Sequence, residues 1–299
     1  MRFRPDDIGT EAHFFIHLKG MVRMGTIVFV GAGSMAEAII AGIVDGGVMH
    51  PRDVFVMNKS DDDRLSYLQQ KYGVSIVCPE RKALRDAELI VLGTKPKDIH
   101  QAMADIAGFL NENAAVLSVI AGVSIATIEC GLGSRPIARS MPNTSATIGK
   151  SATGVSMNHA VDEQMKRRIL TLLSGIGIVK EVQEDELHAV TALSGSGPAY
   201  IYYMVEALEE AAITEGLSKE IARELIIQTF EGASAMLRQT GEEPSVLRTN
   251  VTSPNGTTEA GIKALEKNSF KKIIAECIQS AETRSRELGS TSSSATMKE

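Results

Sequence analysis

Short apolar runs alternate with segments of helical spacing from about residue 25 to residue 182. The run at 26–30 is β-branched and apolar, and the segment that follows repeats apolar residues at helical intervals up to a Gly pair at 46–47. Further strand-like runs lie at 53–58, 75–77, 89–94, 115–122, 136–142, 154–157 and 176–182. Helical segments at 96–110, 125–132 and 163–173 separate several of them. This alternation predicts a parallel sheet covered by helices on both faces.

Beyond residue 182 the pattern becomes helical throughout. Helical spacing covers 184–193, 199–215, 219–239, 258–267 and 270–287. These helices have broad apolar faces, as Ile201, Met204 and Leu208 illustrate. We expect part of this surface to be buried against a second subunit, and a self-contained helix bundle is the alternative.

The change of pattern divides the chain into an α/β domain at 24–182 and an all-α domain at 183–288. Residues 1–23 lack the long apolar core of a signal peptide, and Asp6, Asp7 and Glu11 interrupt them. We expect these residues to lie outside the fold, either as a flexible tail or because translation starts at Met21 or Met24. The Ser/Thr-rich end, 289–299, has no periodicity and is expected to be disordered.

Composition narrows the class of protein. The 299 residues are 43% hydrophobic and 23% charged, with a formal net charge of −6. This acidity argues against a nucleic-acid partner, and no apolar run has the length of about 18 residues that a membrane span needs. The cysteines, Cys78, Cys130 and Cys277, show no metal-ligand spacing. We expect no metal site, and the sparse cysteines favour a reducing, cytoplasmic location.

A glycine-rich segment lies between the first strand and the first helix. It reads G-x-G-x-x-A, and its members are Gly31, Ala32, Gly33, Ser34, Met35 and Ala36. In this pattern the first Gly permits a tight turn, the second lets the backbone approach a pyrophosphate, and the small last residue lets helix and strand pack closely. The sequence therefore predicts a Rossmann-type dinucleotide-binding domain followed by an all-α C-terminal dimerisation domain.

The end of the second strand bears on the choice of coenzyme. An acidic residue there would bind the ribose hydroxyls of NAD, whereas this chain has Asn58, Lys59 and Ser60. NADP(H) is favoured and NAD(H) remains possible, because Asp61–Asp63 follow directly. We interpret these carboxylates as the acidic first turn of the next helix, and a carboxylate turned toward the ribose is the alternative.

Two further loops, 93–96 and 121–124, follow predicted strand ends, where open α/β sheets bind their ligands. Lys95 in the first loop would approach a phosphate or a substrate carboxylate, or else be a solvated surface residue.

Several motifs together resemble pyrroline-5-carboxylate reductases. They are "GAGSMAEAIIAGI", "TKP", "AGVSIATIE", "MPNT", "LSGSGPAY" and "NVTSPNGTTEAGIKALE", and the likeness runs from about Gly25 to Leu288. The resemblance implies reduction of Δ1-pyrroline-5-carboxylate to L-proline with NAD(P)H in proline biosynthesis. It also implies a homodimer formed by the helical domain, with further assembly into decamers in many members.

The resemblance also implies roles for individual residues. Gly31–Ala36 would hold the pyrophosphate and Asn58–Ser60 the adenosine ribose. The residues implied to line the cofactor are Thr94, Lys95, Pro96, Ala121, Gly122 and Val123. Those implied around the substrate are Asn250, which lies near both ligands, Ser253, Gly256 and Thr257, which hold the carboxylate, and Thr258, whose hydroxyl meets the ring nitrogen. Asn255 departs from the usual Gly and leaves the backbone of this loop in doubt.

The segment at 251–266 has no His or Cys, so its chemistry must come from placement. Its loop ends where a helix begins at about Thr258, and free N–H groups at a helix start can bind a carboxylate. The alternative is that Ser, Thr, Asn and Pro merely cap the helix. Two other functions stay open: another NADP-dependent imine or hydroxyacid reductase, and a non-catalytic dinucleotide-binding regulatory protein.

Overall fold

The structure is a computed structural model that describes residues 25–78 and 80–294, with side chains as far as residue 289. The expected extension at 1–23 and the two candidate start methionines lie outside the described residues, as do residues 295–299 of the expected tail. The described chain forms two compact units. One, the sheet unit, runs to Gly195 and includes the residues from Glu282 onward, and the other, the helical unit, is Ser196–Ala281.

An eight-stranded sheet, counted over the described residues, forms the centre of the sheet unit, with the order β3-β2-β1-β4-β5-β6-β7-β8. The strands are β1 (Thr26–Val30), β2 (Val54–Met57), β3 (Ser75–Ile76), β4 (Ala87–Leu92), β5 (Ala115–Ser118), β6 (Ile137–Met141), β7 (Ser151–Met157) and β8 (Gly177–Glu181). Neighbouring strands are parallel except for β6 and β7, which are antiparallel. The predicted parallel sheet is confirmed for the other neighbouring pairs, and β6–β7 departs from it. Residues 142–150 hold only a short turn, and a parallel return needs a longer crossover.

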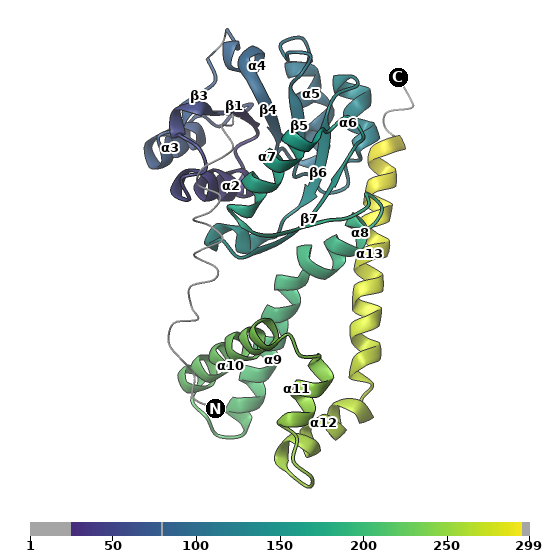
Figure 1. Cartoon of the computed structure of the whole chain (residues 1–299). Helices are drawn as coiled ribbons and strands as arrows, with labels where there is room; N and C mark the ends of the chain where they lie inside the picture. The colour runs from purple at the N-terminus through teal and green to yellow at the C-terminus, as the bar shows by residue number, and fades with distance from the viewer. Residues whose placement is uncertain (1–24, 79, 295–299) are drawn as a thin grey trace. The chain divides into compact units, whose positions relative to one another are not determined.

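Helices cover both faces of this sheet, as predicted (Figure 1). Alternate residues of β1 point to opposite faces, so Ile27 and Phe29 join one buried cluster and Val28 and Val30 the other. The first cluster includes residues of α2 (Ser34–Asp45), α3 (Asp62–Tyr72) and α7 (Glu163–Ser174), and the second includes residues of α4 (Lys82–Asp86), α5 (Ile99–Ala107) and α6 (Ile125–Leu132). Leu65 and Leu68 of α3 are both buried on one face, as the spacing predicted.

Short helical turns complete the sheet unit. They are the 3₁₀ turns η3 (Pro51–Asp53), η4 (Pro96–Asp98) and η5 (Thr144–Ile148), the helix α8 (Leu187–Val190) and the π-helix η6 (Thr191–Gly195). Sequence analysis placed the domain boundary after residue 182, whereas the compact units divide after Gly195. The reason is local packing: Gly154 of β7 leaves room for the side chains of Leu187 and Val190.

The helical unit contains α9 (Gly197–Thr214), α10 (Lys219–Thr240), α11 (Pro244–Asn250), α12 (Thr257–Lys267) and the first part of α13 (Phe270–Ser294). A bidentate ion pair joins α9 to α10, with Arg223 Nε and Nη2 at 2.6 and 2.9 Å from the Glu209 carboxylate. Many large apolar side chains of this unit are exposed, Tyr203 at 74% and Leu225 at 57% among them. Such a surface is typical of a unit that binds a second subunit.

The last helix is longer than the sequence pattern indicated. We expected disorder from residue 289, whereas α13 continues to Ser294. Contacts of Ser285 with His188 and of Arg286 with Asp185, all within the sheet unit, hold this part of the helix. Among the described residues no helix has the length and apolar character that crossing a membrane requires.

Candidate active site

The glycine loop between β1 and α2 is shaped by close backbone contacts. Gly31 has φ +103°, and a Cβ atom on it would lie 2.7 Å from the carbonyl carbon of Gly93. Its N–H donates to the Met57 carbonyl oxygen at 3.0 Å, which ties the loop to the end of β2. Gly33 is the N-cap of α2 and carries no side chain that would cap the helix. The first N–H groups of α2 therefore have no side-chain cap from Gly33, which is compatible with the predicted anion site.

The six residues of this motif differ in what they expose. Ala32 and Ala36 are buried, with Ala36 packed in the core, whereas Gly33 and Ser34 are exposed and Met35 is half-buried. A ligand at this loop would consequently meet backbone rather than side chains at most positions.

A charged cluster that the sequence did not reveal braces the glycine loop. Arg64 of α3 donates through Nε to the Ala32 carbonyl oxygen at 2.8 Å and through Nη2 to Glu37 at 2.5 Å. Glu37 also accepts hydrogen bonds from Lys71 at 3.0 Å and from the Tyr72 hydroxyl at 2.9 Å. Burial alone would raise the pKa of Glu37, but the hydrogen bonds from Lys71, Arg64 and Tyr72 lower it to about 2. The two cations offset the charge of a carboxylate near the anion site.

The loop after β2 offers a cation and a hydroxyl. The Asn58 side-chain oxygen accepts from the Lys59 N–H at 2.7 Å, while Lys59 and Ser60 are exposed. Asp61 is the N-cap of α3, and its carboxylate accepts from the Arg64 N–H at 2.9 Å. Asp62 and Asp63 lie in the first turn of that helix. The sequence pattern predicts the whole acidic run in this first turn, and Asp61 lies one position earlier as the N-cap.

The loop after β4 contains a buried hydroxyl that lacks a partner. Gly93 N–H donates to the Val30 carbonyl at 2.9 Å and so keeps this loop beside the glycine loop. Thr94 Oγ1 is buried and has no hydrogen-bond partner within the described chain. Buried polar atoms are nearly always paired, so an unpaired one beside a candidate site fits a missing ligand. Lys95 and Pro96 follow it and are exposed.

The loop after β5 joins the same edge of the sheet. The Val119 N–H donates to the Leu92 carbonyl at 3.0 Å, which aligns it with the β4 loop. Ala121 is exposed, and Gly122 has φ +75°, a conformation that favours Gly. The Val123 side chain is buried in the core, so only its backbone can face a ligand.

All the predicted cofactor residues thus follow β1, β2, β4 and β5, which are adjacent and parallel. Their carboxyl ends lie at one edge of the sheet. From β1 the chain proceeds to β2 and β3 on one side and later to β4 and β5 on the other. Such a switch of strand order is where open α/β sheets bind dinucleotides.

The predicted substrate residues lie together in the helical unit, at the turn between α11 and α12. Asn250 is the last residue of α11, and α12 starts at Thr257. Asn255 has φ +59°, so it adopts the left-handed conformation that was in doubt for a residue other than Gly. Its N–H donates to Glu259 at 2.9 Å, and the Gly256 N–H donates to the Ser253 carbonyl at 3.0 Å.

Gly256 is the N-cap of α12, and no side chain of the described residues caps this helix. A Cβ atom at Gly256 would lie 2.4 Å from Ser253 Oγ, so a side chain there would force the Ser253 hydroxyl to move. The N–H groups of the first turn remain open to an anion, and the side chains of Ser253, Thr257 and Thr258 beside them are exposed. The loop contributes hydroxyls and N–H groups, with Glu259 as its acidic residue. The hydrogen bond from Lys263, then that from the Asn255 N–H, lowers the pKa of Glu259.

The predicted residues therefore form two sets, a dinucleotide edge in the sheet unit and a helix start in the helical unit. Sequence reasoning missed Arg64 and Glu37, which brace the first set across long sequence separations. The one local signal for them was the acidic residue directly after the glycine motif. This fold and these loops define a two-domain oxidoreductase of the dinucleotide-binding type.

Comparison with known proteins makes the class specific. The family model for pyrroline-5-carboxylate reductase dimerisation matches residues 184–288, and that for NADP oxidoreductase, coenzyme F420-dependent, matches residues 26–122. Pyrroline-5-carboxylate reductase 2 of Bacillus subtilis is 43% identical over 89% of this chain and 95% of its own length.

Solved structures agree. A pyrroline-5-carboxylate reductase from Coxiella burnetii superposes with a TM-score of 0.84 at 37% identity, covering 89% of this chain and 99% of its own. The pyrroline carboxylate reductase of Plasmodium falciparum, solved with NADP bound, gives a TM-score of 0.79 at 28% identity, with coverages of 90% and 100%. The chain belongs to the pyrroline-5-carboxylate reductase family.

Proposed function

We propose that this protein reduces Δ1-pyrroline-5-carboxylate to L-proline with NADPH, as a cytoplasmic enzyme of proline biosynthesis. The observation that carries the proposal is the uncapped start of α12 at Gly256, which offers N–H groups to a small carboxylate beside an exposed Thr258. A family relative whose structure contains NADP supports the choice of coenzyme.

The residues at the sheet edge fit NADPH. The first turn of α2 takes the pyrophosphate, Lys59 and Ser60 take the 2′-phosphate side of the adenosine, and the unpaired Thr94 hydroxyl gains a partner. Lys95, Pro96 and the 121–123 backbone line the remainder. When bound, NADPH supplies a hydride for the electrophilic carbon of the protonated imine.

The chain's own contribution to catalysis is placement. The N–H groups at the start of α12 and the hydroxyls of Ser253 and Thr257 hold the substrate carboxylate, and Asn250 lies beside it. A fixed carboxylate restricts the orientation of the small ring, and orientation of this kind lowers a barrier by on the order of several kcal/mol. The helix dipole favours the bound anion by about 0.3 to 1 kcal/mol.

Thr258 acts at the ring nitrogen. Its hydroxyl donates to, or accepts from, this nitrogen as the positive charge of the iminium disappears. Hydroxyls do not titrate in the working pH range, so this contact needs no acid with a shifted pKa.

The matched family model describes dimerisation. We propose that this chain forms a homodimer and that the dimers associate further into a decamer.

The test is an assay of NADPH absorbance in the presence of the full-length protein and Δ1-pyrroline-5-carboxylate. We expect loss of the absorbance together with formation of L-proline. If NADPH is consumed only with another cyclic imine or with a keto acid, the substrate assignment is wrong. If the protein binds NADPH and turns over none of these compounds, a regulatory role replaces the enzymatic one.

A further inference from the structure

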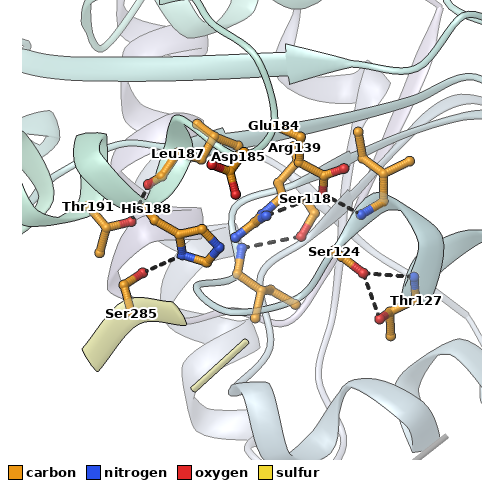
Figure 2. Close-up of polar contacts among 12 residues, drawn as sticks. Ser118, Ser124, Thr127, Arg139, Glu184, Asp185, Leu187, His188, Thr191 and Ser285 are labelled. Carbon is orange, nitrogen blue, oxygen red and sulfur yellow. Dashed lines mark hydrogen bonds and ion pairs between the residues drawn. The ribbon is translucent and has the colours of Figure 1, made fainter. Parts of the chain in front are cut away.

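Within the sheet unit, the end of α13 is attached by charged and polar contacts to the segment that leads into α8. Arg286 Nη1 and Nη2 lie 2.5 and 2.9 Å from the two carboxylate oxygens of Asp185, which is a bidentate pair. Glu282, one turn earlier, accepts from the same guanidinium at 2.9 Å and orients it. His188 Nδ1 and Ser285 Oγ share a hydrogen bond of 2.9 Å (Figure 2). Ser285 is 8% exposed, so this contact belongs to the packed part of the unit.

The same end of α13 lies against the loop after β5. A Cβ atom on Gly122 would be 3.6 Å from the carbonyl carbon of Leu288 and 3.7 Å from the nitrogen of Gly289. A Cβ on Gly289 would in turn lie 3.4 Å from His188 Cε1 and 3.9 Å from the Gly122 oxygen. The helix backbone therefore borders one side of the 121–123 loop.

The other side of this loop is fixed by Glu184. Its Oε1 accepts from the Ile125 N–H at 2.8 Å and from Arg139 Nη1 at 3.2 Å, and Arg139 is only 5% exposed (Figure 2). Ser124 caps α6 by accepting from the Thr127 N–H at 3.1 Å. One end of the loop is therefore held by Glu184 and Ser124. Its other part, Ala121–Gly122, lies against α13.

Glu184 and Asp185 are consecutive residues, so one short segment holds the anchored end of the loop and the end of α13 together. We propose that Asp185 and Arg286 are positioning residues: by holding α13 in register they keep the 121–123 backbone in place for the nicotinamide half of the coenzyme. This inference rests on the proposed function, in which that loop lines the coenzyme.

The sheet order explains why the nicotinamide half is affected. The adenosine side of the proposed site follows β2, whereas β4 and β5 lie on the other side of β1. A dinucleotide with its adenosine at β2 and its pyrophosphate at β1 extends toward β4 and β5 with its nicotinamide half. Loosening α13 should therefore weaken binding of the whole coenzyme and leave binding of its adenosine fragment unchanged.

The experiment compares Arg286→Gln and Asp185→Asn with Arg284→Gln in the full-length protein. Arg284 is on the same helix and pairs with Glu287 at 2.8 Å within the helix, so its loss removes an equal charge and leaves the Asp185–Arg286 pair in place. For each variant, dissociation constants are measured for NADPH and for adenosine 2′,5′-bisphosphate, which lacks the nicotinamide half. Steady-state KM and kcat are measured in parallel.

We expect both test variants to weaken NADPH binding about 3- to 10-fold, because the pair is partly exposed but bidentate. The dissociation constant of the bisphosphate should change by less than about twofold. Arg284→Gln should match the wild type for both probes. Equal losses for the two probes, or test variants that behave like Arg284→Gln, would overturn the inference. If Arg286→Gln does not fold, Asp185→Asn decides by the same comparison. Failure of the wild type to bind NADPH would instead reject the proposed function.

Discussion

At the scale of single residues, the proposed site uses hydroxyl and backbone N–H groups, apart from Lys59 and Lys95 at the coenzyme. Thr258 is exposed at the start of α12, Thr94 Oγ1 is buried without a partner among the described residues, and Asn255 holds the turn at φ +59°. None of these side chains titrates at working pH. The contribution of each must therefore appear in rate or affinity rather than in the position of a pH optimum.

Replacing Thr258 with Ala should lower kcat on Δ1-pyrroline-5-carboxylate by about 10- to 1000-fold, because one hydroxyl contact to the ring nitrogen is lost. Thr258 is exposed, so the circular dichroism spectrum and the melting temperature should not change. Thr214→Ala is the control, since its hydroxyl bonds only to the Glu210 carbonyl at 3.0 Å in the described contacts. Unchanged turnover of the Thr258 variant rules out its catalytic role.

Lys59→Ala tests the recognition of the 2′-phosphate. Loss of a cation beside a phosphate should raise the KM for NADPH about 10-fold and change the KM for NADH by less than about twofold. Lys82→Ala is the control, because Lys82 is exposed at the start of α4 and so precedes the amino end of β4. Equal changes for both coenzymes would show that Lys59 does not contact the phosphate.

His188 should make the attachment of α13 sensitive to acid. Burial, followed by the guanidinium groups of Arg139 and Arg286, lowers the pKa of His188 below 6.5, while Asp185 and Glu282 act in the opposite direction. Below pH 6.5 the unfolded chain therefore binds more protons than the folded one. The contribution of neutral His188 to stability is complete above pH 6.5 and is lost as the pH falls.

The measurement is the urea midpoint at about pH 7 and about pH 5 for the wild type and for His188→Gln, which keeps a polar group near Ser285 but cannot titrate. The wild type should lose more stability than the variant between these two conditions. An equal loss in both proteins would mean that His188 does not contribute to the acid sensitivity.

At the scale of elements, loops that connect parallel strands to helices shape the site, and their glycines set the backbone. Gly31 combines a positive φ with close contact to Gly93, whereas Gly47 has φ +66° and no atom of the described residues lies within 4 Å of its potential Cβ. A substitution at Gly47 therefore measures backbone strain alone, whereas one at Gly31 measures strain together with a steric clash.

Gly31→Ala should lower the free energy of unfolding by about 2 to 5 kcal/mol, since strain and overpacking combine. Gly47→Ala carries strain alone and should cost about 1 to 2 kcal/mol. Chemical unfolding of both variants measures the difference. Equal losses would show that the β4 loop moves aside without a penalty and that the tight contact does not shape the site.

The sequence predicted these elements where hydrophobic periodicity was strong and missed them where it was weak. The ends of β1 and α6 agree with the structure, because a buried apolar run and a Ser124 cap define them locally. The short helices α4 and α11 were not predicted, since segments of 5 and 7 residues give too few repeats of the helical period. The antiparallel turn into β7 depends on the length of a connection, which periodicity does not report.

For the candidate site, the glycine motif and the Asn58–Ser60 segment could be proposed from the sequence because each lies within a single loop after a strand. The Arg64–Glu37 pair and the Glu184–Arg139 pair were not, because each joins residues from different elements. A single sequence reports which residues follow a strand but not which distant side chain reaches them.

At the scale of the whole molecule, the chain belongs to the pyrroline-5-carboxylate reductase family. Its sheet unit contains the candidate coenzyme edge, and its helical unit contains the start of α12. The helical unit exposes large apolar side chains, and the matched family model describes its dimerisation. The residues from Glu282 onward belong to the sheet unit, so α13 connects the dimerisation domain to the domain that holds the coenzyme edge.

The central claim is that the start of α12 binds the carboxylate of a small ring. A crystal structure of the full-length protein with NADP and L-proline tests it most directly. We predict that the proline carboxylate accepts hydrogen bonds from the first N–H groups of α12 and that the ring nitrogen lies within hydrogen-bonding distance of Thr258 Oγ1. A carboxylate bound away from the Ser253–Thr258 turn would contradict the account.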